Sequence, residues 1–153
     1  MALVELLLTP LPAHVRTARL VGVAAARRAG LDAELVDELR LAVGEACSRA
    51  VGLHARHNPG TPVRVTVNDE PTRLTVTVTD AGPAAGPAPA DVTRGLFETG
   101  GDDEELVDPD VALAVLAGLV DGVDIVPGES GTTVTMHWPL ALDAAPGVTA
   151  VSR

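Results

Sequence analysis

Aromatic residues and cysteine are scarce in this chain of 153 residues, which holds no tyrosine, one phenylalanine (Phe97), one tryptophan (Trp138) and one cysteine (Cys47). A core must therefore be packed from Leu, Val and Ala, and the hydrophobic content of 46% suits one globular domain. A lone cysteine cannot form an internal disulfide. Cys47 falls on the apolar side of a predicted helix, so we expect a core residue rather than a catalytic thiol.

Long apolar runs are missing as well. The opening stretch, residues 2–8, contains Glu5 and is too short to span a bilayer. It also lacks the preceding basic residues of a signal peptide. We therefore expect a cytoplasmic protein with no membrane partner.

Basic residues are outnumbered, since 11 of them face 21 acidic residues and the formal net charge is -10. Nucleic-acid binding is driven largely by cationic groups that displace counterions from phosphates, so this charge argues against a DNA or RNA partner. A basic or mixed-charge protein partner is easier to reconcile with the negative electrostatic field of the chain.

The first 60 residues predict one strand followed by two helices. The apolar run Ala2–Leu8 predicts a strand buried on both faces. Pro12 then suits a first helical turn and Gly30 a helix stop, which predicts a helix to Ala29. Asp32 is a plausible N-cap for a second helix, whose apolar residues recur at spacings of four and three until about residue 57.

After residue 60, apolar residues recur at every second position instead of at helical spacing. Val63–Val67 and Leu74–Val78 alternate with polar residues on either side of a turn, which predicts an antiparallel hairpin. A third helix is expected over Pro109–Val120, and a second hairpin over 123–126 and 132–138. This order of elements predicts an α+β fold, a two-layer sandwich with a mostly antiparallel sheet and helices on one face.

The predicted domain covers residues 1–140. Residues 81–91 are rich in proline and glycine, and they begin a stretch that we expect to form a mobile lid until about residue 108. Residues 141–153 are predicted to be a flexible tail.

Four motifs carry a resemblance to a known family. They are "LRLAVGEACSRAV" at 39–51, "LTVTVTDAG" at 74–82, "VALAVLAGLVDGVDI" at 111–125 and "GTTVTMHWPL" at 131–140. In this order they resemble the N-box, the first glycine box, the helix after the second glycine box and the closing strand of the anti-sigma factors and serine protein kinases of bacterial stress control. These belong to the GHKL superfamily, and the resemblance implies its Bergerat, histidine kinase-like ATPase fold.

The resemblance implies an adenine pocket for ATP or ADP. It assigns adenine contacts to Asp80 and Thr133, with Gly82 allowing the backbone to approach the ring. Taken alone, Asp80 fits a turn aspartate that ends a strand better than an adenine contact.

The catalytic part of the motif set is altered. Glu45 aligns with the family's general base, but Arg49 stands where the family has the asparagine that holds Mg²⁺. A guanidinium has no acceptor and repels a cation, so no metal site is expected. Glu45 and Arg49 also fit an ordinary helical ion pair at i and i+4.

The phosphate-binding glycines of the family align with Asp110 and Ala112. A carboxylate there repels polyphosphate, and a methyl group blocks close approach. Pro109 and Asp110 are also simply a good helix start. We further expect Arg49 to pair with Asp110 or Glu45. His54 and His57, three residues apart, are expected at the surface or at the helix end rather than on a metal.

These changes favour an anti-sigma-type regulatory protein that acts by partner switching without kinase activity and needs no cofactor. Its partners would be a sigma factor or a STAS-domain anti-anti-sigma protein, and a homodimer would form through the first strand and helix. The alternative is an active ATP-dependent serine kinase that uses Glu45. A third possibility is a Bergerat domain with a non-nucleotide ligand or another protein partner.

Overall fold

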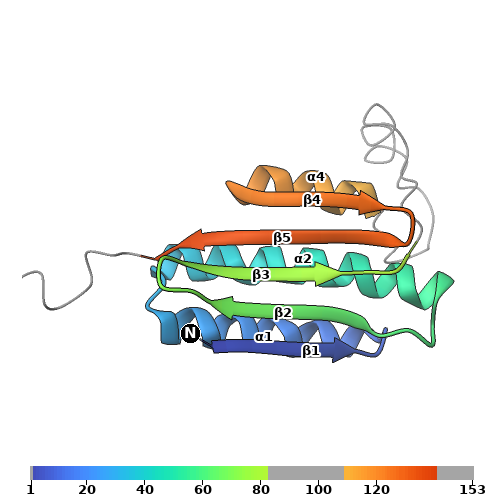
Figure 1. Ribbon diagram of the computed structural model, residues 1–153, viewed down its shortest axis with the longest axis horizontal. Helices are drawn as coiled ribbons and strands as arrows, with labels where there is room; N and C mark the ends of the chain where they lie inside the picture. The colour runs from blue at the N-terminus through green and yellow to red at the C-terminus, as the bar shows by residue number, and fades with distance from the viewer. Residues whose placement is uncertain (1, 83–108, 141–153) are drawn as a thin grey trace, which may run out of the picture.

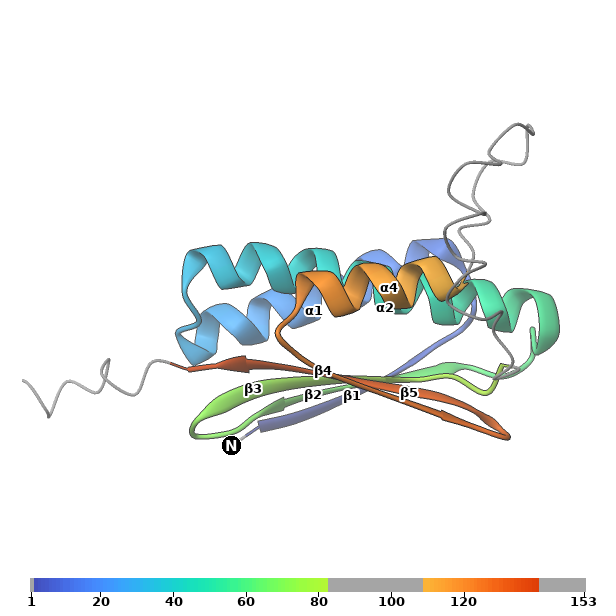
Figure 2. The ribbon, with the colours of Figure 1, turned by 90° about the horizontal axis from the view of Figure 1, so that it is seen from above.

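The computed structural model describes residues 2–82 and 109–140, with the side chains of residues 3–82 and 111–140. Within these ranges the chain forms two layers, a sheet and a set of helices packed on one face of it (Figures 1 and 2). The predicted α+β sandwich is therefore confirmed. The lid beyond Gly82 and the tail at 141–153 lie outside the described residues.

The helices begin and end close to their predicted limits. Helix α1 spans Pro12–Ala29 with proline in its first turn, and Gly30 ends it in the left-handed conformation at φ 83°. Helix α2 spans Ala33–His57, and Asp32 holds the N-cap position without a side-chain capping hydrogen bond. Helix α4 spans Pro109–Leu119. None of these described helices combines the length and the apolar character needed to cross a bilayer.

The sheet has five strands in the order β1-β2-β3-β5-β4. All neighbours are antiparallel, so the sheet is more regular than the predicted mostly antiparallel one. The strands are β1 (Ala2–Leu8), β2 (Val63–Asp69), β3 (Arg73–Thr79), β4 (Gly122–Gly128) and β5 (Gly131–Pro139). Both predicted hairpins are present.

The prediction that the first strand is buried on both faces is wrong. β1 is an edge strand, and Leu3 and Leu7 are 69% and 58% exposed. Its register places Leu8 opposite Val63, on the face that the helices cover. Because the described helices cover only one face of the sheet, alternate residues of a continuous apolar run remain in solvent.

The core lies between the two layers and is built almost entirely from aliphatic side chains. Trp138 is its largest member, is 1% exposed, and donates its indole N–H to the Glu38 carboxylate at 3.1 Å. Most other members with at most 2% exposure come from α2 and the three central strands: Leu39, Ala42, Val43, Ala46, Cys47, Ala50, Val63, Val65, Val67, Leu74, Val76, Val78, Val134 and Met136. Helix α1 adds Ala18 and Ala26, and α4 with the residue that follows it adds Leu116 and Val120.

A glycine controls the contact between two neighbouring strands. Gly131 has φ 142°, and a Cβ at this position would overlap the Asp80 carbonyl oxygen. We predict that Gly131→Ala lowers the free energy of unfolding by at least about 2 kcal/mol, because it adds backbone strain and a steric overlap. Urea denaturation followed by circular dichroism measures this.

Gly52→Ala is the matched control. Gly52 lies inside α2, and a Cβ there would meet no heavy atom within 4 Å. Alanine should raise stability at this site by about 0.5–1 kcal/mol through helix propensity. Equal effects of the two substitutions would contradict the role assigned to Gly131.

Candidate functional site

A buried ion pair joins the helix layer to the end of β3. Arg49 of α2 donates from Nη1 to Oδ2 of Asp80 at 2.6 Å, and the two side chains are only 5% and 2% exposed. Asp80 continues the alternation of Leu74, Val76 and Val78, so its carboxylate points toward the helices. Asp80, the predicted adenine contact, therefore pairs with Arg49, the residue that stands in place of the family's Mg²⁺-binding asparagine.

The expected pairing of Arg49 with Glu45 is wrong. Arg49 uses its length to reach the neighbouring layer, whereas a helical pair with Glu45 would contribute only about 0.2–0.5 kcal/mol. Glu45 is half-buried and forms no ion pair with any described residue. The other expected partner, the Asp110 side chain, lies outside the described side chains.

The second oxygen of Asp80 is also occupied. Oδ1 accepts the backbone N–H of Gly82 at 3.0 Å. A Cβ on Gly82 would lie 3.0 Å from the Cβ of Leu53, so glycine allows this backbone to approach α2 closely. Each oxygen of the carboxylate thus already has a donor from the chain itself.

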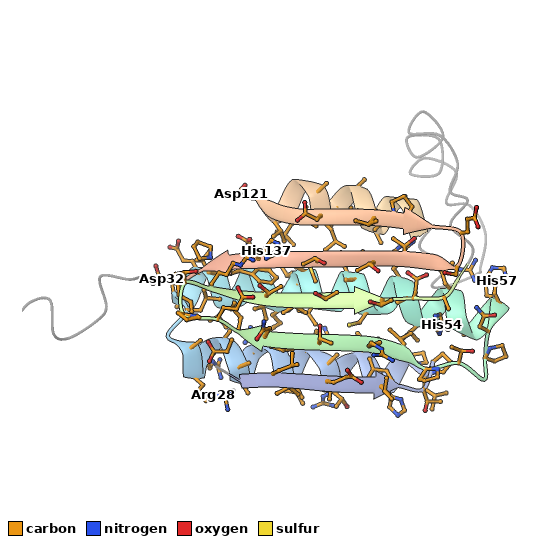
Figure 3. All side chains as sticks on the ribbon, in the orientation of Figure 1. Arg28, Asp32, His54, His57, Asp121 and His137 are labelled. Carbon is orange, nitrogen blue, oxygen red and sulfur yellow. The ribbon has the colours of Figure 1, made fainter. Side chains whose placement is uncertain are left out.

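Two further α2 contacts hold the residue between Asp80 and Gly82. The N–H of Ala81 donates to Nε2 of His54 at 2.8 Å, and Nδ2 of Asn58 donates to the Ala81 carbonyl at 2.8 Å. Nδ1 of His54 is 2.7 Å from the Thr61 carbonyl, which requires the proton on Nδ1 because Nε2 accepts. The neutral ring therefore bridges two backbone segments (Figure 3).

The burial of His54 corrects the expectation that it lies at the surface or simply caps the helix. It is 1% exposed, whereas His57, one turn later, is exposed as expected. The helical spacing contained the signal, because His54 follows Ala50 by four residues on the buried stripe.

The structure does not bring the Thr133 side chain to the Asp80 carboxylate. Thr133 pairs with Thr79 in the β3–β5 register, so it lies on the opposite face of the sheet. Thr132, which is 2% exposed, is the threonine beside Asp80, and its carbonyl accepts the Asp80 N–H at 3.0 Å. The alternation of buried residues along β5 could have identified Thr132.

An open cavity of about 410 Å³ lies at this end of the sheet, and both Asp80 and Thr133 border it. The Asp80 carboxylate nevertheless faces α2, where Arg49 and Gly82 occupy it. Ala112, predicted at a phosphate-binding position, is 3% exposed, and its helix packs against α2. Asp80 and Ala112 thus lie in close contact with other protein groups, whereas Thr133 borders the open cavity.

The remaining groups to consider are the metal-ligating side chains and the thiol of Cys47. Among the described residues, no group of three His, Cys, Asp or Glu side chains could hold a metal ion. Burial raises the pKa of the Cys47 thiol from 9.0 to about 12, and the nearby charge of Arg19 lowers it only in part. A protonated, buried thiol is a poor nucleophile, in agreement with the predicted core role.

Comparisons with known proteins fit this architecture. A family model described as the histidine kinase-like ATPase domain matches residues 8–138. The crystal structure of the RsbU and RsbW domains of Rv1364c from Mycobacterium tuberculosis superposes with a TM-score of 0.63 at 18% sequence identity, over 92% of this chain and 33% of that one. The chain thus spans about one third of that relative's length.

The histidine kinase domain of the Escherichia coli osmosensor EnvZ gives a TM-score of 0.40 at 24% identity, over 67% of this chain and 66% of that one. No curated protein sequence matches the chain at a significant level. The shared fold therefore rests on the family model and the first superposition.

Breaking the buried ion pair should be costly. Arg49→Met leaves the Asp80 carboxylate without its cation, and Asp80→Asn leaves the guanidinium unpaired. We expect each substitution to lower the free energy of unfolding by about 3–5 kcal/mol, and the double variant to lose about 2–3 kcal/mol less than their sum. Urea denaturation of the four proteins measures the coupling.

The exposed pair Arg40–Asp37, at 3.1 Å on the same helix, is the matched control. Arg40→Met and Asp37→Asn should show a coupling of at most about 1 kcal/mol. Additive effects of Arg49→Met and Asp80→Asn would refute the pairing.

At alkaline pH, the change of protein stability with pH should depend on the thiol of Cys47 alone, because the chain has no lysine and no tyrosine. Since the folded pKa of about 12 exceeds the ordinary 9.0, the unfolded chain loses the thiol proton first, and stability falls as pH rises between these values. The slope should reach about 1.4 kcal/mol per pH unit. Denaturation of wild type and Cys47→Ala measures it, and an equal slope in both would contradict this assignment.

Proposed function

This chain belongs to the histidine kinase-like ATPase domain family, and from this premise we propose that it is a regulatory member that binds protein partners and does not use Mg-ATP. The observation that carries the proposal is the Arg49–Asp80 pair. An adenine amino group would have to displace a charge-assisted bond of 2.6 Å and leave a guanidinium buried without its anion.

The loss of phosphate and metal positions supports the same conclusion. Arg49 cannot ligate Mg²⁺, because it carries only donors and a positive charge. The buried methyl group of Ala112 stands where the family resemblance expects a glycine, and Asp110 adds an acidic residue at the start of α4. All three residues, Arg49, Asp110 and Ala112, disfavour Mg-ATP binding, and three such changes are harder to compensate than one.

We propose a sigma factor or a STAS-domain anti-anti-sigma protein as the partner, in partner switching in the cytoplasm of a bacterium. The motif resemblance supports this choice, and the presence of an RsbW domain in the superposed mycobacterial structure agrees with it. We also propose a homodimer through β1 and α1. The exposed Leu3 and Leu7 on the edge strand β1 support such a contact.

One observation favours the alternative, an active serine kinase that phosphorylates an anti-anti-sigma protein. Glu45, which aligns with the general base, is half-buried and pairs with no cation in the described part of the chain. A free carboxylate of this kind can accept a proton from a hydroxyl group. Nucleotide binding separates the two proposals.

Calorimetric titration with ATP and ADP, with and without Mg²⁺, tests the proposal directly. We expect no binding to the wild type at millimolar nucleotide. The triple variant Arg49→Asn, Asp110→Gly, Ala112→Gly should bind nucleotide, because it frees the Asp80 carboxylate and opens the phosphate positions. Micromolar Mg-dependent binding to the wild type would refute the regulatory hypothesis.

Two controls make the result specific. Adding Asp80→Asn to the triple variant should abolish the recovered binding, because the amide does not offer the same pair of acceptors. Arg40→Asn, an exposed arginine on the same helix, should leave the wild-type result unchanged.

A further inference from the structure

Helix α1 is basic in an acidic chain. It contains Arg16, Arg19, Arg27 and Arg28 and no acidic residue, whereas the whole chain carries a net charge of -10. Three of these arginines share one helical stripe with Leu20 and Val23, because the stripe residues lie three, four or seven positions apart. Together with Arg40 of α2, this stripe lines a groove of about 270 Å³, which we call the arginine groove.

The groove lies between α1 and α2, and no strand residue lines it. Leu20 is 62% exposed, and Arg16, Arg27 and Arg40 are exposed as well. Figure 2 shows the helices on one side and the sheet on the other, and all residues that line the groove belong to α1 or α2.

Positive charge is concentrated in the groove. In the described part of the chain, no carboxylate forms a salt bridge with Arg16, Arg19 or Arg27. Arg40 pairs only with the exposed Asp37 of its own helix. Like charges gathered on one surface raise the energy of the free protein and attract an acidic partner.

The backbone of α2 makes room for one wall of the groove. A Cβ on Gly44 would lie 3.1 Å from Cδ of Arg19, so glycine allows this side chain to lie across α2. Val23 is 7% exposed and forms apolar floor beside the more exposed Leu20. The groove thus combines an apolar centre with a cationic rim, as hot spots of protein interfaces do.

We propose that the arginine groove is a docking surface for an acidic amphipathic helix of a partner protein, an assignment that rests on the proposed function. An apolar side chain of that helix would sit over Leu20 and Val23, and its carboxylates would pair with Arg16 and Arg27. These two arginines are eleven positions apart, or about 16 Å along α1, which matches three turns of a partner helix.

A labelled synthetic peptide tests the surface. The probe is a helical 15-residue peptide with glutamates on both sides of a central leucine stripe, and its binding is followed by fluorescence anisotropy. We expect binding to the full chain that weakens with salt. Arg16→Gln with Arg27→Gln should weaken it about tenfold, which corresponds to two rim ion pairs.

Arg28→Gln with Arg56→Gln is the matched control, since both residues are exposed arginines outside the groove lining and the change in net charge is the same. Figure 3 places Arg28 at the C-terminal end of α1. This pair should change the affinity by less than about twofold. Equal thermal unfolding of both double variants shows that folding does not explain the difference.

Three outcomes of the peptide measurements would overturn the proposal. They are absence of peptide binding to the wild type, equal weakening by the two double variants, and equal binding of a peptide with glutamine in place of glutamate. Tighter binding of a labelled single-stranded oligonucleotide than of the peptide would also overturn it. None of these results changes the nucleotide titration, which depends on Asp80, so failure of the groove and failure of the proposed function are distinguishable.

Discussion

The buried Arg49–Asp80 pair is the constraint on which this end of the molecule depends. Two opposite charges taken out of water are tolerated only when each finds the other, and the 2.6 Å contact meets that requirement. The pair binds α2 to the exit of β3. The contacts of His54 and Asn58 with Ala81 then hold the same backbone from one turn further along the helix. Both oxygens of the Asp80 carboxylate are occupied by donors of the chain itself.

Close backbone approach makes this arrangement possible. Gly82 brings the chain against Leu53, and Gly131 brings β5 against the Asp80 carbonyl. A side chain at either position would push the strand end away from α2 and lengthen the hydrogen bonds that hold it. The glycines of this region therefore allow the strand ends to pack closely on α2 and on each other.

The closed interior and the charged exterior fit one functional description. Inside, the Arg49 cation and the Asp80 carboxylate neutralise each other. Outside, the arginines of α1 have no anions among the described residues, and Leu20 stays in solvent beside them. These two features agree with the proposal that the protein binds its partners through its surface. The chain has the histidine kinase-like ATPase fold, and the proposed docking groove lies on its helix layer.

The sequence by itself determined the helix limits at Pro12 and Gly30, the two hairpins and the family, because proline, glycine and apolar periodicity act within a few residues of one another. Only the tertiary structure decided the partner of Arg49, which lies 31 residues away, and the exposure of one face of β1. It also decided that Thr132, not Thr133, lies beside Asp80. A long arginine can reach several carboxylates, and a one-residue shift reverses the face of a strand residue, so layer packing and strand register make these choices.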